Sequence, residues 1–516
     1  MEVRQLAELV FSKIFEINTP YPEQVTCFEK IWQETSSGKA PVTVLRLPTG
    51  YGKTESLVSP YFGQFLANQW FLAPRIIYSL PTQALCNQVY CRMRRYVENV
   101  YRVCGKKLVV EVQHGSKAED PYFIGDIVVT TFDQLLYGYA RAMRHIHDRI
   151  DIPAGSISLS YVVLDEAHMY SPYTHALVKA LLEILNRSSI PVSIATATMP
   201  SKLLNEMTEG LSNVKIVNYT KGHVVNRSVH IHVVDSTLLK NNKLNGKMKS
   251  LMENAENTLI VCNSVKKAIN IWRQLFDWGF KPILVHSRFT PPDRDAHENE
   301  VTSILSKTGT RKGVIVTTQV CEAGLDISAD VLITECAPAD ALVQRSGRCA
   351  RWENQKGEIY IFKHDSHLPY KEKFIDITWD YLQSNPNIDF ANWDQTINFV
   401  DVLPYSVDAI LAKESLNELY EATLYADSRP TELTAREESF VSICLGTFPT
   451  KQNLVNIPYE IADTREFKNE VLELRGKNFL NWDFRKRSWV PRGYIAPYCI
   501  YKGKLQKYTS DVGLYW

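Results

Sequence analysis

Short apolar runs alternate with longer segments of helical periodicity along most of the chain, beginning at Val42. Each run is continuously apolar and rich in β-branched residues, which is typical of parallel strands covered by helices on both faces. The runs are 42–47, 76–80, 108–112, 126–131, 161–165 and 193–198 in the first half, and 258–264, 282–287, 313–318, 331–335 and 358–362 in the second. Strands that alternate with helices predict right-handed βαβ units, and therefore an α/β chain with two doubly wound parallel sheets.

The same pattern indicates where the chain divides. We expect the junction between the two sheets near 217–228, in the stretch VNYTKGHVVNRS. After about residue 370 the pattern loosens into aromatic-rich helical segments, and from Phe479 short strand-like pieces follow between Pro and Gly residues. The predicted domains are therefore 1–225, 226–370 and 371–516, and the last is a smaller α/β accessory domain.

Composition narrows the class of protein. The 516 residues are 45% apolar and 22% charged, as in an ordinary globular protein, and the net charge of +1 gives no global sign of a nucleic-acid coat. Nucleic acid is not excluded, because a local groove is enough to hold a backbone. The ten cysteines form no C-x-x-C pair, so we expect free thiols in a cytoplasmic protein. Neither a membrane span nor a secretory signal is expected.

The stretch LPTGYGKTE, residues 47–55, follows the first predicted strand and precedes a helical segment. That context suits a phosphate-binding loop, in which backbone N–H groups and a helix N-terminus face the phosphates. Lys53 would reach the β and γ phosphates and the Thr54 hydroxyl would bind Mg²⁺, while Thr49, Gly50 and Gly52 form the loop. Leu47 stands where the general pattern has Gly, so this stretch alone is equally compatible with a simple turn.

Asp165 and Glu166 end another apolar run, in YVVLDEAH. Open parallel sheets place their ligand sites at this end of their strands. Asp165 would hold Mg²⁺, and Glu166 would orient and deprotonate the water that attacks the γ-phosphate. The alternative is a solvated pair that caps the following helix.

Three short segments each stand at the end of a predicted strand: GKT (52–54), DEAH (165–168) and TAT (196–198). In this order they resemble motifs I, II and III of superfamily-two helicases of the DEAH type. QRSGRCAR (344–351) resembles motif VI, which implies Gln344 near the γ-phosphate and Arg348 and Arg351 as arginine fingers. VTTQVCEAGLDIS (316–328) resembles motif V, which implies Gly324 and Asp326 near the nucleotide. Gln24 matches the upstream glutamine that reads the adenine. Without the other motifs, the arginines of 344–351 would indicate only an exposed helix face.

Further phrases resemble one branch, the CRISPR-associated helicase of type I interference (the "Cas-three" family). They are SLPTQALCNQVYCRMRR, QHGSK, VVTTFDQLL, VVLDEAHMYSP, TATMP, VHSRF, LITECAPADALVQRSGR and YTSDVGLYW. The resemblance implies two RecA-like domains with ATP between them, and an ATP-driven translocase on single-stranded DNA that works with a CRISPR RNA-guided surveillance complex. A DEAH helicase acting on RNA or in DNA repair is the alternative enzyme, and a nucleotide-gated binding module is the alternative without unwinding.

By their positions in the family motifs, four hydroxyl residues would hold the backbone of one nucleic-acid strand: Thr82, Thr131, Ser264 and Thr317. Small hydroxyls grip a backbone without reading bases, although single Thr residues are more often ordinary strand ends. Basic and aromatic residues are interspersed in the stretch 475–489. This stretch would either form a positively charged wall on which the bases of the strand stack, or be only an amphipathic hairpin.

Histidine positions predict a helicase-only form. None of the twelve histidines precedes His114 or follows His367, so a metal-binding HD nuclease domain has no evident set of ligands. The pairs His147-Asp148 and His364-Asp365 are interpreted as surface loop residues. We therefore expect a separate HD nuclease subunit to cut the DNA.

Overall fold

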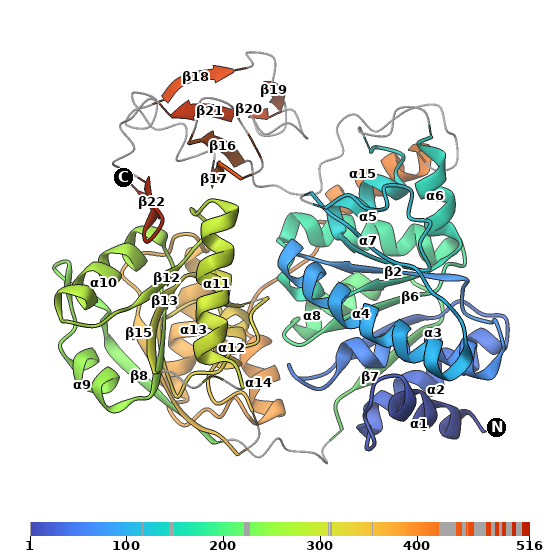
Figure 1. Ribbon diagram of the computed structural model, residues 1–516, viewed down its shortest axis with the longest axis horizontal. Helices are drawn as coiled ribbons and strands as arrows, with labels where there is room; N and C mark the ends of the chain where they lie inside the picture. Colours follow the sequence, from blue (N-terminus) through green and yellow to red (C-terminus); the bar gives the residue numbers. More distant parts are fainter. Residues whose placement is uncertain are drawn as a thin grey trace. The chain divides into compact units, whose positions relative to one another are not determined.

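The computed structural model describes residues 2–115, 117–143, 149–220, 228–307, 309, 312–322, 324–352, 354–422, 440–445, 450, 452–458, 471–475, 480–483, 488–491, 498–501 and 508–515. By contacts the chain forms two compact units (Figure 1). Unit 1 contains Met1–His223 and Tyr405–Glu437, and unit 2 contains Val224–Pro404 and Glu438–Trp516. The three-domain division at 225 and 370 stays a prediction.

Unit 1 contains a sheet of seven parallel strands in the order β3-β4-β2-β5-β6-β1-β7. The strands are β1 Val42–Arg46, β2 Arg75–Leu80, β3 Val110–Gln113, β4 Ile127–Thr131, β5 Ser160–Leu164, β6 Val192–Thr196 and β7 Val214–Asn218. Because β5, β6 and β1 are neighbours, the loops that follow them meet at one edge of the sheet.

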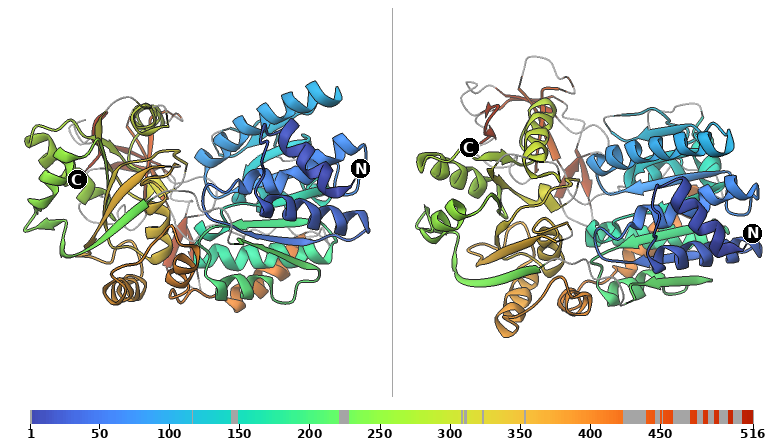
Figure 2. Two further views of the ribbon diagram at one scale, coloured as in Figure 1. Left: turned by 90° about the horizontal axis from the view of Figure 1, so that it is seen from below. Right: turned by 60° about the horizontal axis from the view of Figure 1, so that its bottom comes forward.

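Helices cover both faces of this sheet (Figure 2). On one side lie α1 Val3–Lys13, α2 Pro22–Ser36, α3 Lys53–Ala67 and α4 Gln83–Cys104. On the other side lie α5 Phe132–Tyr139, α6 Asp151–Ser158, α7 Pro172–Arg187, α8 Ser201–Thr208 and α15 Ala409–Tyr420. Although α15 is distant in sequence, it packs on α7 and contributes Leu416 and Leu419 to the same buried core.

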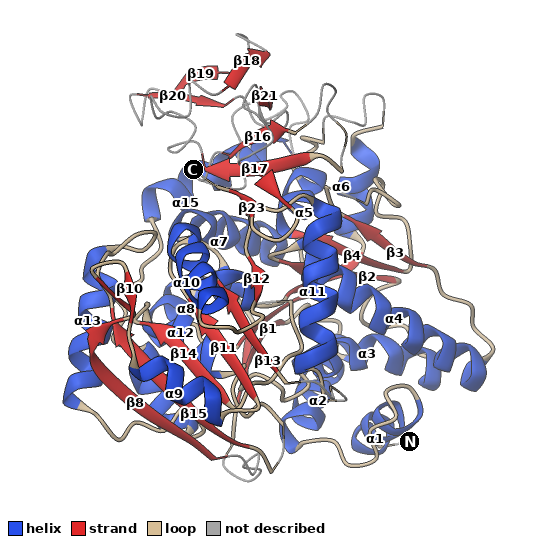
Figure 3. Ribbon diagram, turned by 60° about the vertical axis from the view of Figure 1, so that its left-hand side comes forward, coloured by secondary structure: helices blue, strands red, loops and turns tan. Residues whose placement is uncertain are grey.

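Unit 2 contains six parallel strands in the order β12-β13-β11-β14-β15-β8. They are β8 Ser228–Thr237, β11 Asn257–Val261, β12 Ile283–Val285, β13 Gly313–Thr317, β14 Val331–Glu335 and β15 Lys356–Lys363. One face packs on α9 Lys247–Asn254 and α10 Val265–Asp277. The other faces α11 Pro291–Leu305 and α12 Ala339–Ser346, and Figure 3 shows the strands in red between blue helices. A short hairpin, β9 Leu239–Lys240 and β10 Lys243–Leu244, precedes α9.

The C-terminal part of the chain is mixed. Helices α13 Glu372–Ser384 and α14 Trp393–Val400 pack on α12. A four-stranded sheet has the order β17-β16-β21-β18, from β16 Phe440–Cys444, β17 Leu454–Pro458, β18 Val471–Arg475 and β21 Tyr498–Tyr501. Two strand pairs, β19 Leu480–Asp483 with β20 Ser488–Pro491 and β22 Tyr508–Thr509 with β23 Gly513–Leu514, complete the set. The side chains of the predicted stacking wall at 475–489 lie outside the described residues.

The predicted α/β class with two doubly wound parallel sheets is confirmed. Each of the eleven apolar runs overlaps a strand, but β7 and β8 are missing from the prediction. Both are edge strands whose residues are largely half-buried or exposed, so they lack the continuous apolar run of a central parallel strand. Among the helices of the described residues, none is long and apolar enough to cross a membrane.

Candidate nucleotide site

The predicted phosphate loop joins β1 to α3, which begins at Lys53. Gly52 immediately precedes the helix with a φ of 63°, and a Cβ atom there would lie 2.3 Å from Nε2 of Gln24. Only glycine fits this conformation and this close approach. Thr49 and Gly50 are exposed, whereas Lys53 and Thr54 are buried at the start of the helix. The loop therefore has the strand-to-helix geometry that exposes backbone N–H groups to an anion.

Gln24 connects α2 to this loop. Its Nε2 donates to the carbonyl of Gly52 at 3.2 Å, and its Oε1 accepts from the backbone N–H of Tyr21 at 2.8 Å. Only 1% of the residue is exposed, so it is not a solvated helix residue. Its side chain positions the phosphate loop in this structure, and its predicted role in reading the adenine stays a prediction.

Asp165 lies directly after β5 and is buried. Its Oδ2 accepts a hydrogen bond of 2.5 Å from the hydroxyl of Tyr78, and its Oδ1 accepts one of 2.8 Å from the backbone N–H of Glu166. Burial and the neighbouring charge of Glu166 raise the pKa of Asp165, and the Lys53 ammonium offsets part of that rise. Tyr78 comes from β2, the neighbour of β5, and the sequence analysis did not single it out.

Glu166 has a φ of 53°, an uncommon left-handed conformation for a residue other than glycine. Its Oε1 lies 3.7 Å from Nζ of Lys53, and its Oε2 lies 3.5 Å from Nδ1 of His168. The helix that follows is capped by Ser171, which accepts from the N–H of Thr174. The alternative of a helix-capping acidic pair is therefore wrong, and the pair instead faces the phosphate loop lysine.

The TAT segment is linked to the DEAH segment. Oγ1 of Thr196 lies 3.3 Å from Nδ1 of His168 and accepts a hydrogen bond of 3.1 Å from the N–H of Met199. Arg46, the last residue of β1, donates to the Met199 carbonyl at 2.8 Å. Side chains therefore connect the ends of β1, β5 and β6 across the carboxyl edge of the sheet.

The residues at this edge fit a magnesium ion. Of the two predicted ligands, Asp165 accepts a hydrogen bond from the Tyr78 hydroxyl, and Thr54 lies near the same hydroxyl. They offer hydroxyl and carboxylate oxygens, which Mg²⁺ prefers. The raised pKa of Asp165 reflects a buried negative charge that Lys53 compensates only in part, and a divalent cation would compensate the rest.

In unit 2 the motif VI arginines are held by their neighbours. Nε of Arg348 donates to the Cys321 carbonyl at 2.9 Å, and Nη2 donates to the Glu322 carbonyl at 2.8 Å. Arg351 forms an ion pair with Asp326, with Nε and Oδ1 2.8 Å apart. Both arginines therefore bind the motif V segment, which contains Gly324 with a φ of 83°.

Arg345 is a structural residue that the sequence analysis passed over. It is completely buried. Its guanidinium forms an ion pair with Glu322 at 2.8 Å and donates to Oγ1 of Thr334, Oδ1 of Asn263 and the hydroxyl of Tyr370. With Arg345 and Arg348 both buried, the alternative of an exposed arginine face is wrong. Gln344, the other predicted catalytic residue of this motif, is partly exposed.

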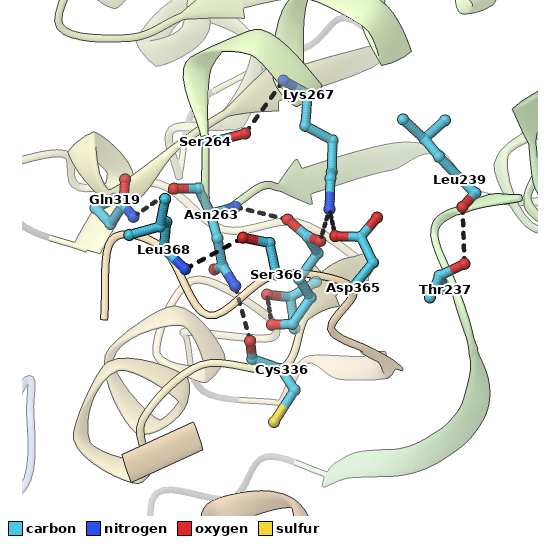
Figure 4. Close-up of polar contacts among 12 residues, drawn as sticks. Thr237, Leu239, Asn263, Ser264, Lys267, Gln319, Cys336, Asp365, Ser366 and Leu368 are labelled. Atoms are coloured by element: carbon cyan, nitrogen blue, oxygen red, sulfur yellow. Dashed lines mark hydrogen bonds and ion pairs between the residues drawn. The ribbon is translucent and has the colours of Figure 1, made fainter. Parts of the chain in front are cut away.

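Figure 4 shows a second polar network at the carboxyl ends of β11, β14 and β15. Lys267 forms ion pairs with Glu335 and Asp365, and these carboxylates raise the pKa of Lys267 although burial opposes them. The N–H of Asn263 donates to Glu335 at 2.7 Å, and Nε2 of Gln319 donates to the Asn263 carbonyl at 2.9 Å. The network fixes the segments that follow these strands.

The four predicted nucleic-acid contacts all lie at or just after the carboxyl ends of strands. Thr82 and Ser264 cap α4 and α10 by accepting from Leu85 and Lys267 N–H groups at 3.3 Å. Thr131 and Thr317 are buried, with 3% and 1% exposed. These positions have local structural roles, and contact with a nucleic acid stays a prediction for each of them.

Comparison with known protein families gives two matches along the chain. Residues 22–207 match the DEAD/DEAH box helicase family, and residues 254–354 match the C-terminal region of the CRISPR-associated nuclease/helicase Cas3 family. The CRISPR-associated helicase Cas3 of Thermoproteus tenax is 29% identical over 82% of this chain and 74% of its own length. A putative CRISPR-associated nuclease/helicase Cas3 of Methanocaldococcus jannaschii is 30% identical over 69% of this chain, which spans 51% of that relative.

Solved structures share the fold. A crystal structure of T. fusca Cas3 with ADP has a TM-score of 0.69 at 17% identity, over 95% of this chain and 68% of the other. A chain in the structure of a CRISPR RNA-guided surveillance complex, pre-nicking, has a TM-score of 0.63 at 17% identity, over 100% of this chain and 72% of the other.

Proposed function

The chain belongs to the Cas3 family of CRISPR-associated, ATP-dependent helicases, and from this premise we propose that it moves along single-stranded DNA and unwinds target DNA in type I antiviral interference. The observation that carries the proposal is the group formed by Lys53, Asp165 and Glu166 at the carboxyl edge of the first sheet. A buried lysine at a helix N-terminus beside two carboxylates suits phosphoryl transfer from a nucleotide to water.

Each residue of this group has a distinct proposed task. The phosphate loop, with Thr49, Gly50 and Gly52, holds the phosphates through its N–H groups, and Lys53 binds the β and γ phosphates. Glu166 orients the attacking water and accepts its proton. Thr54 and Asp165 would hold Mg²⁺, which, when bound, neutralises charge on the phosphates.

We assign unit 2 a role in the same reaction. Arg348 and Arg351 would stabilise the charge that develops on the transferring phosphoryl group, with Gln344 beside it and with Gly324 and Asp326 near the nucleotide. The hydrogen bonds and the ion pair of both arginines to the 321–326 segment support this role, because a finger must be held in a fixed direction to act.

The partners belong to the same proposal. Single-stranded DNA would be held along Thr82, Thr131, Ser264 and Thr317, since hydroxyls at strand ends grip a backbone without reading bases. A CRISPR RNA-guided surveillance complex would supply that strand, and a separate HD nuclease subunit would cut it. The nine cysteines whose side chains the structure describes are free thiols, as expected for the cytoplasmic location that we propose.

ATP hydrolysis by the purified chain, measured alone, with single-stranded DNA and with single-stranded RNA, tests the proposal. We expect DNA to stimulate turnover more than RNA, and Glu166→Gln to abolish the stimulated rate. Stronger stimulation by RNA would favour an RNA helicase instead. Nucleotide binding without any stimulated turnover would favour a nucleotide-gated binding module.

A further inference from the structure

Two imidazoles from the loop between β15 and α13 lie beside a carboxylate of α13, and none of the three has a proposed task in ATP hydrolysis. His364, His367 and Asp376 each present one ligand atom, and these atoms all lie within 4.8 Å of one another. Within the described ranges, no other histidine, cysteine and carboxylate side chains form such a group of three.

The distances in this group are those of ligands around a small cation. Nε2 of His364 lies 3.6 Å from Oδ1 of Asp376, and Nε2 of His367 lies 3.7 Å from the same oxygen. Both separations exceed a hydrogen bond of about 2.7–3.2 Å. Tetrahedral ligands at about 2.1 Å from a zinc ion are separated by about 3.4 Å. The two histidine–aspartate separations are therefore close to those between the ligands of a bound zinc ion.

Local structure holds the ligands in place. His364 follows β15 directly, and only 10% of its side chain is exposed. Its Nδ1 is buried without a hydrogen-bond partner among the described residues, so hydrogen bonds do not explain the position of this ring. Asp376 and Glu372 are four residues apart on α13 and share one face of the helix. Asp365, between the two histidines, is anchored by Lys267 (Figure 4).

We propose that His364, His367 and Asp376 bind a divalent transition cation of the zinc class. Imidazole nitrogen and carboxylate oxygen form a typical ligand set for such ions. Glu372, whose Oε1 lies 3.7 Å from Nε2 of His367, or a water molecule would take the fourth position. The cation would fasten the end of the second sheet to α13, and would thereby fix Asp365 beside Lys267.

The test uses the full chain, stripped with a chelator and with its thiols blocked, so that cysteines cannot bind the metal. Equilibrium dialysis against Zn²⁺ gives the stoichiometry and affinity, and the visible absorption of Co²⁺ reports the coordination geometry. His367→Ala and Asp376→Asn are the informative variants, because both side chains are partly exposed and their loss should leave the fold intact. His232→Ala is the matched control, since His232 also pairs with a carboxylate, that of Glu358, but belongs to no such group of three.

We expect one Zn²⁺ per chain in the wild type and in His232→Ala. Affinity should fall at least about tenfold in His367→Ala and in Asp376→Asn, with loss of the Co²⁺ spectrum, because even the loss of a residue that only supports a ligand costs about that much. Failure of the wild-type chain to retain Zn²⁺ would overturn the proposal. Unchanged affinity in both variants would also overturn it, and the group would then be an ordinary set of histidine–carboxylate ion pairs.

Discussion

The hydroxyl of Tyr78 donates a hydrogen bond of 2.5 Å to Oδ2 of Asp165, across two neighbouring strands of the first sheet. The bond orients a buried carboxylate that has a proposed role in binding Mg²⁺. We expect Tyr78→Phe to lower the rate of ATP turnover at least about tenfold, because a hydrogen bond to a charged group contributes about 1.5–3 kcal/mol. Steady-state hydrolysis at saturating ATP measures this rate.

Tyr161→Phe is the matched control for that variant. Tyr161 is also buried in the same sheet, but its hydroxyl donates to Oγ of Ser193 at 2.6 Å, so no carboxylate is involved. We expect near wild-type turnover from it. If both variants lost the same fraction of the turnover rate, the Tyr78 hydroxyl would act only through packing and not through its bond to Asp165.

Asp165→Asn should raise the thermal stability of the nucleotide-free protein although it abolishes turnover. The pKa of Asp165 is raised in the folded state, so the carboxyl stabilises the fold at low pH and this contribution is lost as the pH rises through the raised pKa. The gain in melting temperature should therefore be largest at about pH 8, should shrink as the pH falls below the raised pKa of about 6, and should vanish below the ordinary pKa of 3.8. A variant that is less stable than wild type at alkaline pH would show that Asp165 does not carry a destabilising charge.

Lys53→Ala and Glu166→Gln should both abolish ATP turnover, but for different reasons. Lys53→Ala removes the phosphate ligand, so nucleotide affinity should also fall. Glu166→Gln removes only the base and keeps the phosphate loop, so ATP should still bind. Turnover assays together with binding of a fluorescent ATP analogue separate the two effects. Undiminished hydrolysis in either variant would contradict the assignment of the site.

Arg348→Ala and Arg351→Ala should each slow hydrolysis at least about a hundredfold, with a much smaller change in ATP affinity. Circular dichroism must show that both variants remain folded, because Arg348 also binds the Cys321 and Glu322 carbonyls. Arg345→Ala is the contrasting variant. It would leave Glu322 buried without its ion-pair partner, which costs about 3–5 kcal/mol, so we expect it to unfold unit 2. Turnover near the wild-type rate in the two finger variants would refute their role.

Incubation of the purified chain with Mn²⁺, Ni²⁺ or Co²⁺ and single-stranded DNA should leave the DNA intact. We propose that a separate HD nuclease subunit cuts the DNA, and that the His364 site would hold a cation only to fasten α13 to the second sheet. Cleavage that is lost in His147→Ala or His364→Ala would show that cutting resides here. His147 lies outside the described residues, whereas the side chain of His364 is largely buried, so it is not the surface loop residue that the sequence suggested.

The sequence predicted best what depends on local order along the chain. Central parallel strands are continuous apolar runs, so both sheets and the loops at their carboxyl edges, including Lys53 and Asp165, were predictable. Edge strands such as β8 were not, because half-exposed residues do not form such a run.

The sequence analysis also missed residues whose roles depend on a partner that is distant along the chain. Tyr78 looks like one more residue of an apolar strand until β5 is placed beside it. Arg345 and Asp376 owe their environments to residues on other elements, which no spacing in the sequence reveals.

Nζ of Lys53 and Oε1 of Glu166 lie 3.7 Å apart. The Lys53 ammonium is therefore already paired with a carboxylate, and any phosphate or sulfate that binds it must share it with Glu166. A small anion must compete with Glu166 for Lys53, and its binding free energy is small because it makes few other contacts. A triphosphate can also bind the loop N–H groups and the N-terminus of α3, and these additional contacts compensate for the weakened Lys53–Glu166 ion pair. We therefore expect the Lys53–Glu166 ion pair to favour the binding of a triphosphate over that of a small anion.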